Sequence, residues 1–461
     1  MTPMTTQGTV GSRLSDWAMQ LDLDQIPVEV QHAATRHLLD GVGLAIAAQR
    51  LHAATAACSV ARMFTVNKGV RMIGGSDSLA VPGAALANGV LVHALDFDDT
   101  HAHGLVHATA VVLPAAFAVG QVVAATGAEV LVAAVIGYET VCRVAAASPH
   151  GFHARGLHAT SVCGTLGAAL ITSRLHTASA NTAVNALGIS ASTSGGLLEF
   201  LDTGSDTKTL HPGLASMNGV IAAELAMAGG QGPASALEGA RGLYATMSAR
   251  NANTESVVME LGERWETTQI SIKPIPACQL MHVTLDAASN SPILASEISR
   301  IEVVVHPDSS PTVCEPREVK NTPRTPYDAK FSLPWTLAAQ IIDGQITLDT
   351  YQSKLLDRPE VVSLAKLVEV TLGADQGVAA EASGHVRIHS RSGDVWEGHV
   401  QGSRGTPLRP LSDSELIAKF LSNCGGSPLA EELADIVLNL ATQPNLDRLH
   451  ELASVIANQE V

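Results

Sequence analysis

Residues 108–137 read ATAVVLPAAFAVGQVVAATGAEVLVAAVIG, and this run of small apolar side chains decides the fold class. Pro114, Gly120, Gln121, Gly127 and Glu129 interrupt it, whereas a membrane span needs about 20 predominantly apolar residues. We therefore expect closely packed core helices here and no membrane span. Apolar residues recur at three- and four-residue spacing from about 12 to 262, which is typical of helices.

The pattern changes after Lys273-Pro274-Ile275-Pro276. Strands are predicted at 301–305, 368–372, 384–390 and 395–400, the last two joined by a turn, and helical segments at 333–343 and 348–357. Ser412 and Glu415 then form the Ser-x-x-Glu capping box of a new helix. The predicted fold class is mainly α. A large all-helical domain, discontinuous in sequence, comprises residues 1–268 and 406–461, and a smaller α/β lid domain is inserted at 269–405.

Composition narrows the classes of partner. The chain has 461 residues, long enough for two domains, and its net charge is −16 without a run of Lys or Arg, which argues against nucleic acid or an anionic membrane as a partner. The six cysteines show no Cys-x-x-Cys spacing, so neither a zinc site nor a disulfide framework is expected. The polar first residues lack the apolar core of a signal peptide, and we expect a cytoplasmic protein.

Four polar clusters interrupt the apolar background, and histidine and lysine recur among them. They span residues 96–107, 155–160, 206–211 and 273–282. Removal of a proton next to a carboxylate needs a base with a pKa near the working pH and a fixed cation for the charge that develops. Because histidine supplies the first and lysine the second, the clusters predict a site for a small anionic carboxylate.

Each candidate also has a structural interpretation. A lone buried histidine is more often a hydrogen-bonded core residue than a base, Asp98 and Asp99 can cap the following helix, and Lys208 can be a solvated loop residue. Cys278 is more readily explained as a small buried hydrophobe than as a nucleophile, because no dedicated base accompanies it. The spacing of Asp and His matches no zinc or iron motif, and we expect neither a metal nor a cofactor.

Five ordered motifs resemble those of the MmgE/PrpD family, whose members include 2-methylcitrate dehydratases, cis-aconitate decarboxylases and iminodisuccinate epimerase. The motifs are ALDFDDTH at 94–101 with His107, GLHAT at 156–160 with GTLGAA at 164–169, KTLHPG at 208–213, KPIPAC at 273–278 and DAKFS at 328–332. The resemblance implies a helical domain with an α/β lid, a homodimer, and cofactor-independent chemistry in the cleft between the domains.

The resemblance also implies which residues act. The catalytic positions are Asp96, Thr100, His107, His158, Lys208 and Lys273. One of the two histidines is then the base and the other the proton donor, both lysines anchor carboxylates, and the aspartate and threonine orient these groups. Further residues of the polar clusters and of the predicted lid are expected to bind substrate: Arg155, His101, His103, His211, Cys278, His282 and Lys330.

The leading hypothesis is a lyase that dehydrates a 2-methylcitrate-type hydroxy acid. The alternatives are an epimerase of an amino-dicarboxylate such as iminodisuccinate, a cis-aconitate-type decarboxylase, and a non-catalytic dimeric protein that binds an anion. The chain departs from the family pattern at two places. Ala108-Thr109 follows His107 where many members have Pro-Ser, and Cys278 stands near a position where the decarboxylases have histidine.

Overall fold

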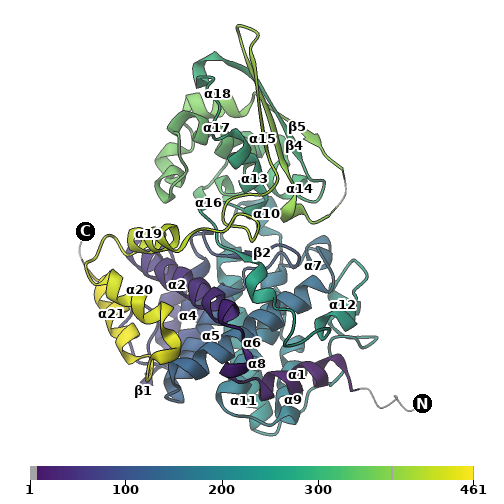
Figure 1. Cartoon of the computed structure of the whole chain (residues 1–461), viewed down its shortest axis with the longest axis vertical. Helices are drawn as coiled ribbons and strands as arrows, with labels where there is room; N and C mark the ends of the chain where they lie inside the picture. Colours follow the sequence, from purple (N-terminus) through teal and green to yellow (C-terminus); the bar gives the residue numbers. More distant parts are fainter. Residues whose placement is uncertain (1–7, 375–376, 460–461) are drawn as a thin grey trace. The chain divides into compact units, whose positions relative to one another are not determined.

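The computed structural model describes residues 8–374 and 377–459, which divide into two compact units (Figure 1). Of these residues, the helical unit contains 8–198, 208–270 and 412–459, and the α/β unit contains 199–207 and those within 271–411. The described chain is mostly helical with a small four-stranded sheet, which confirms the predicted mainly α class. The role of the α/β unit as a lid stays a prediction.

The helical unit combines long buried helices with short surface segments. Its α-helices are α1 (Val10–Gln20), α2 (Val28–Arg50), α3 (Thr55–Ala61), α4 (Val81–His93), α5 (Thr109–Val122), α6 (Gly127–Ala146), α7 (Gly151–Ala154), α8 (Ala159–Leu175), α9 (Ala180–Ser192), α11 (His211–Met227), α12 (Leu243–Met247), α19 (Asp413–Asn423), α20 (Ala430–Leu438) and α21 (Asp447–Ala457). The strands β1 (Thr65–Val70) and β2 (Thr100–His101) and the 3-10 segments η1 (Leu23–Gln25), η2 (Arg62–Phe64), η4 (Thr254–Val257), η5 (Glu266–Gln269) and η10 (Leu440–Thr442) complete it. The chain passes between the units at η3 (Thr207–Leu210) and β3 (Ile270–Ser271).

Helix α8 forms the centre of the helical unit, because it packs against α5, α6, α9 and α11. Each of its 17 residues except Arg174 is buried, and most of them are alanine, glycine, serine or threonine. Small side chains let helices approach closely, so a core with few aromatic residues still reaches the packing density of a protein interior. The run 108–137 forms α5 and the first half of α6, both largely buried, as the sequence predicts.

Two glycines let α4 and α11 cross at close range. A Cβ atom on Gly89 would lie 2.5 Å from Cα of Gly213, and a Cβ atom on Gly213 would overlap the carbonyl oxygen of Leu86. Neither position accepts a side chain without movement of the backbone. The crossing matters for the candidate site, because α4 ends at His93 and α11 begins at His211.

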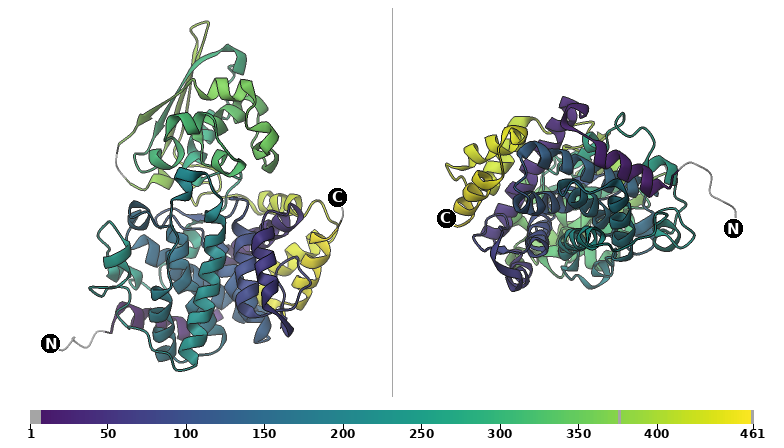
Figure 2. Two further views of the ribbon diagram at one scale, coloured as in Figure 1. Left: turned by 180° about the vertical axis from the view of Figure 1, so that it is seen from behind. Right: turned by 90° about the horizontal axis from the view of Figure 1, so that it is seen from below.

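The C-terminal helices complete the helical unit. The yellow helices α19, α20 and α21 lie beside the purple α2 in the views of Figure 2, and each packs against it. Helix α19 begins with the predicted capping box, in which the hydroxyl of Ser412 accepts the amide of Glu415 and the Glu415 carboxylate accepts the amide of Ser412.

The α/β unit is a four-stranded sheet with helices packed against it. The strand order is β5 (Val368–Leu372), β4 (Ile298–Val305), β6 (Gly384–Ser390), β7 (Val395–Val400), and β4 runs parallel to β5 but antiparallel to β6. Helix α13 (Gln279–Ala288) packs on the sheet, and α17 (Leu333–Asp343) packs on α13. The remaining segments are α10 (Phe200–Thr203), α14 (Ser310–Val313), α15 (Arg317–Asn321), α16 (Pro326–Ala329), α18 (Pro359–Ala365), η6 (Ala295–Glu297), η7 (Leu348–Tyr351), η8 (Ser353–Leu355) and η9 (Ala379–Glu381).

Two expectations for secondary structure are wrong. Residues 12–262 are not helical throughout, because β1 forms at Thr65–Val70, where every residue before Val70 is exposed and no apolar face marks a helix. Residues 348–357 form the 3-10 segments η7 and η8 in place of one longer helix, because Gln352 between them is extended with ψ 141°.

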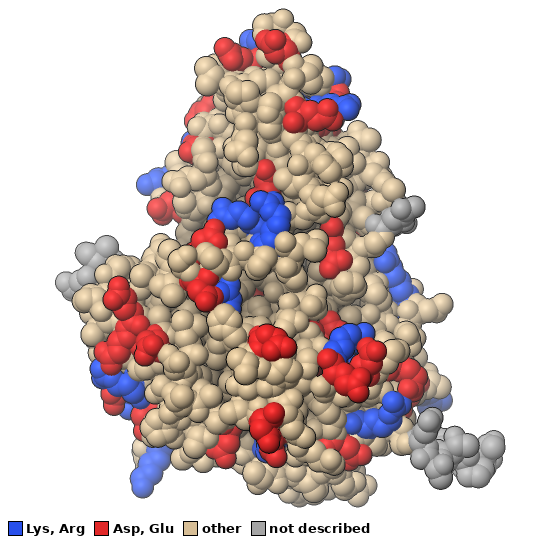
Figure 3. Space-filling model, in the orientation of Figure 1, with Lys and Arg blue, Asp and Glu red and all other residues tan. Residues whose placement is uncertain are grey.

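Among the described residues, no helix is both long and apolar enough to cross a bilayer. On the face of the helical unit seen in Figure 3, some acidic side chains lie beside basic ones and others stand apart among uncharged residues.

Candidate active site

A short polar segment between α4 and α5 forms the base of the candidate site. It runs from His93, the last residue of α4, through β2 to His107, just before α5. Asp96 has a positive φ of 50°, a left-handed conformation that Asp and Asn tolerate better than most residues. This tight bend, together with the bond from the Asp96 amide to the His93 carbonyl at 3.0 Å, turns the chain directly after the helix.

A buried ion pair forms between this segment and η3. Nζ of Lys208 lies 2.5 Å from Oδ1 of Asp96 and 3.4 Å from Nε2 of His107, and the three residues are at most 8% exposed. The structure therefore rejects the interpretation of Lys208 as a solvated loop residue. It places an ammonium group and an imidazole together in a site largely closed to water, where electrostatic interactions are stronger than in bulk solvent.

The surroundings of His107 fix its tautomer. Its Nδ1 lies 2.7 Å from the carbonyl oxygen of Asp99 and 3.3 Å from the hydroxyl of Thr100. Because a carbonyl oxygen only accepts, Nδ1 carries the proton and donates it, and Nε2 of the neutral ring presents its lone pair toward Lys208. The main chain of His107 is held as well, since its amide donates to Oγ1 of Thr160 at 3.0 Å.

His93 belongs to the site although the sequence interpretation did not select it. Its Nδ1 lies 2.6 Å from Oδ2 of Asp98, so the ring donates to the carboxylate, and its Nε2 has no hydrogen-bond partner among the described residues. Burial lowers the pKa of His93 against the opposing effect of Asp98. In the sequence, His93 ends an apolar helical segment and stands five residues before Asp98. These two side chains meet only because the chain turns between them, and hydrophobic periodicity does not predict that turn.

His158 approaches from the N-terminus of α8. Its Nδ1 lies 3.1 Å from Nδ1 of His211, and its Nε2 is buried with no hydrogen-bond partner within residues 8–374 and 377–459. Burial, followed by the charge of Lys208, lowers the pKa of His158 well below its usual value, and burial lowers that of His211 to about 4. Both rings are therefore neutral near pH 7.

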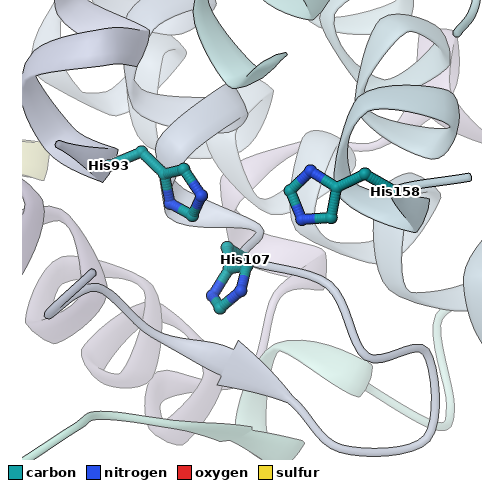
Figure 4. Close-up of side chains that lie close together, drawn as sticks. All are labelled: His93, His107 and His158. Atoms are coloured by element: carbon teal, nitrogen blue, oxygen red, sulfur yellow. The ribbon is translucent and has the colours of Figure 1, made fainter. Parts of the chain in front are cut away.

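Three of these rings, those of His93, His107 and His158, face one another and are called the histidine cluster (Figure 4). The ring centroids of His93 and His107 are 4.8 Å apart, and that of His158 lies 5.9 Å from each of them. One ring nitrogen from each histidine lies within 4.8 Å of its counterparts on the other two. The arrangement supplies neutral proton acceptors beside one ammonium group, and it has the donor set that could hold a metal ion.

Asp99 stabilises the start of α5. Its carboxylate oxygens each lie 3.2 Å from the amide of Thr109, and Oδ2 lies 2.5 Å from the Thr109 hydroxyl. Burial, followed by the negative charge of Asp98, raises the pKa of Asp99 to about 8. The helix-capping role considered from the sequence therefore applies to Asp99, whereas Asp98 binds His93.

Three other predicted residues of the helical unit lie in different surroundings. Nε2 of His101 lies 3.0 Å from Oε2 of Glu266, and its Nδ1 accepts the amide of Gly104, so the ring is held outside the histidine cluster. His103 and Arg155 are exposed. The substrate-binding roles of these three residues stay predictions.

The other four predicted residues belong to the α/β unit and are buried there. Lys273 is fully buried, the amide of Cys278 donates to the carbonyl of Lys330 at 3.0 Å, and Nε2 of His282 lies 3.0 Å from the carbonyl of Ala277. Nζ of Lys330 lies 5.6 Å from the centre of the Tyr351 ring, a cation–π contact. Their roles toward a substrate also stay predictions.

Comparison with known proteins extends over nearly the whole chain. The cis-aconitate decarboxylase of Aspergillus terreus is 28% identical over 474 residues, which covers 96% of this chain and 95% of the relative. Human cis-aconitate decarboxylase is 26% identical over 440 residues, with 91% and 89% covered. A cis-aconitate decarboxylase-like protein of Aspergillus oryzae is 26% identical over 483 residues, with 98% and 99% covered.

Two domain families match in sequence order. The MmgE/PrpD N-terminal domain matches residues 12–255, which include every residue of the histidine cluster, and the MmgE/PrpD C-terminal domain matches residues 275–442. Together with relatives that are lyases, these matches confirm the resemblance read from the sequence motifs. The protein belongs to the MmgE/PrpD family.

Proposed function

We propose that the protein is a carboxy-lyase that decarboxylates a cis-aconitate-type tricarboxylate. The observation that carries this proposal is the buried contact between the ammonium of Lys208 and the lone pair of His107, with His158 nearby. The names of the relatives favour decarboxylation over the dehydration that led the sequence-based hypotheses. Dehydration of a 2-methylcitrate-type acid therefore becomes the second candidate, supported by the family alone.

The reaction needs a cation and a proton donor. When a carboxylate leaves as CO2 from a carbon next to a double bond, the electron pair of the broken bond forms a new double bond to the neighbouring carbon. The electron pair of the old double bond shifts to the far carbon, which takes up a proton. We assign Lys208 to a remaining carboxylate, whose negative charge grows during this step, and His107 or His158 to the proton transfer. Asp96 and Thr100 orient these groups. Lys273 is proposed as a second carboxylate anchor.

The test is incubation of the purified protein with cis-aconitate, 2-methylcitrate and iminodisuccinate in deuterium oxide. Release of CO2 from cis-aconitate, with one deuterium in the product, supports the proposal. Loss of water from 2-methylcitrate or deuterium exchange in iminodisuccinate without CO2 would support the other family reactions and contradict it. A non-catalytic anion-binding protein would bind one of these compounds and turn over none.

Variants separate catalysis from binding. We expect His107→Gln and His158→Gln to lower kcat by about 100-fold or more, because loss of a general acid or base usually costs that much. Lys208→Met should raise KM and lower kcat together, since the ammonium is proposed to act on both bound substrate and transition state. His450→Leu is the matched control: it also removes a buried histidine from the helical unit, next to Phe117, and should keep wild-type kcat.

A further inference from the structure

We propose that His93, His107 and His158 form a binding site for a divalent cation of the zinc class. The three side chains come from the end of α4, the segment before α5 and the start of α8, and one nitrogen of each lies within 4.8 Å of the others. Three imidazoles around one open coordination position are a recurrent donor set for zinc. The sequence shows no zinc motif with closely spaced ligands, because these three histidines come from three separate segments of the chain.

The first support is the orientation of the rings. Nδ1 of His93 is held by a carboxylate of Asp98, Nδ1 of His107 by the carbonyl of Asp99, and Nδ1 of His158 by His211. Metal-binding histidines in proteins characteristically have their second nitrogen held by a carboxylate or a carbonyl, as in His93 and His107, which leaves the other nitrogen for the ion.

The second support is the pair of unused nitrogens. Nε2 of His93 and Nε2 of His158 are buried and have no hydrogen-bond partner among the described residues, and both side chains are at most 1% exposed. A buried polar atom without a partner loses its hydration for no compensating bond, so such atoms call for an explanation. A shared ion would satisfy both of them.

Charge decides how the ion would bind. The ammonium of Lys208 opposes a cation, but Asp96 pairs with it at 2.5 Å, and the carboxylate of Asp98 adds a further negative charge beside His93. The lone pair on Nε2 of His107 accepts a hydrogen bond from Lys208, so this hydrogen bond must break before the nitrogen can coordinate the ion. Tetrahedral zinc places neighbouring nitrogens about 3.4 Å apart, so the ring nitrogens, which lie within 4.8 Å of one another, would have to move closer together on binding.

One consequence rests on the proposed function. His107 and His158 cannot transfer protons while they hold an ion, so zinc should inhibit decarboxylation, and a chelator should restore it. The binding itself is independent of any reaction. If no substrate is turned over but the site still binds the ion, the proposed function fails and this proposal stands.

The experiment measures Co2+ binding by visible absorption and Zn2+ binding by calorimetry. His385 and His399 face each other on neighbouring strands, with ring centroids 4.1 Å apart, and could bind metal at the surface, so His399→Gln is introduced into every protein studied. We expect one equivalent of Co2+ to give the intense visible bands of a tetrahedral site. His93→Gln should weaken binding at least about tenfold, whereas the matched control His450→Leu should leave it unchanged.

A second variant keeps the test valid if His93→Gln does not fold. Asp98→Asn leaves all three ligands in place and removes the carboxylate that holds His93, so it should weaken metal binding by about 10- to 100-fold. Absence of a tetrahedral spectrum, or binding that is equal in the parent, His93→Gln and Asp98→Asn proteins, would overturn the proposal.

Discussion

Nζ of Lys208 lies 2.5 Å from Oδ1 of Asp96, and both side chains are buried although 112 positions separate them in the chain. Breaking a buried ion pair from one side leaves an uncompensated charge, which costs about 3 to 5 kcal/mol. We therefore expect Asp96→Asn to lower the free energy of unfolding by about that amount in urea denaturation. Asparagine also tolerates the left-handed backbone of residue 96, so the turn should be kept. The loss of stability then comes from the missing negative charge.

The double variant provides the control. Replacing Lys208 with methionine in the Asp96→Asn protein removes the unpaired ammonium and should recover a large part of the lost stability. If the effects of the two substitutions simply add, the pair is not coupled as the structure indicates.

The close crossing of α4 and α11 should not tolerate a methyl group. Gly89→Ala places a Cβ atom against the backbone of Gly213, so the helices must separate, at a cost of about 1 to 3 kcal/mol in unfolding free energy. Gly195→Ala is the control, because a Cβ atom there meets nothing within 4 Å. Thermal unfolding of both proteins checks this, and equal melting temperatures would show that the crossing is not tight.

His450 should make the helical unit sensitive to acid. Burial lowers its pKa to about 3, and neither ring nitrogen has a hydrogen-bond partner among the described residues. The unfolded chain takes up a proton below about pH 6.5 and the folded chain does not, so stability falls as the pH drops from 6.5 toward 3. His450→Leu removes this effect. The difference in free energy of unfolding between His450→Leu and wild type should therefore shift in favour of the variant by about 2 kcal/mol when the pH is lowered from 7.5 to 5. Urea denaturation at both pH values measures this.

Asp99 should make the folded protein less stable as the pH rises, the opposite of the effect of His450. Its pKa is raised to about 8 in the folded protein against 3.8 in the unfolded chain, so unfolding releases a proton between these values. Its contribution to stability is greatest in acid and is lost as the pH rises from about 4 to about 8. The stability of Asp99→Asn relative to wild type should therefore increase with pH by up to about 1.4 kcal/mol per unit. A difference that stays constant between pH 5 and pH 7.5 would contradict the raised pKa.

Local patterns predicted much of the architecture. The alternating residues of β6 and β7, the helix at Leu333–Asp343 and the capping box at Ser412 are decided by neighbours in sequence, and the structure has them where the pattern places them. The same reasoning missed β1, whose pairing partner is a residue outside any strand, Leu79. It also did not select His93, whose partner Asp98 is reached through a turn and not along one helix face.

The site was predictable in its residue types and not in its pairings. The motifs pointed to Asp96, Thr100, His107, His158, Lys208 and Lys273. The first five lie close together and buried in the helical unit, whereas Lys273 belongs to the α/β unit, and the catalytic roles of all six stay predictions. His101 belongs to the same motif as Asp96 and Thr100. The motif does not show that the His101 ring contacts Glu266, 165 positions further along the chain.

The sequence by itself determined the mainly α class and the strands of the α/β unit, because periodicity and capping act over a few residues. It also showed which stretches of the chain gather histidine and lysine. Only the tertiary structure decided which histidines meet, which nitrogens stay without a partner and which aspartate pairs with Lys208. These depend on how closely α4, α8 and α11 pack, and that distance is set by glycines and small side chains contributed from segments far apart in the chain.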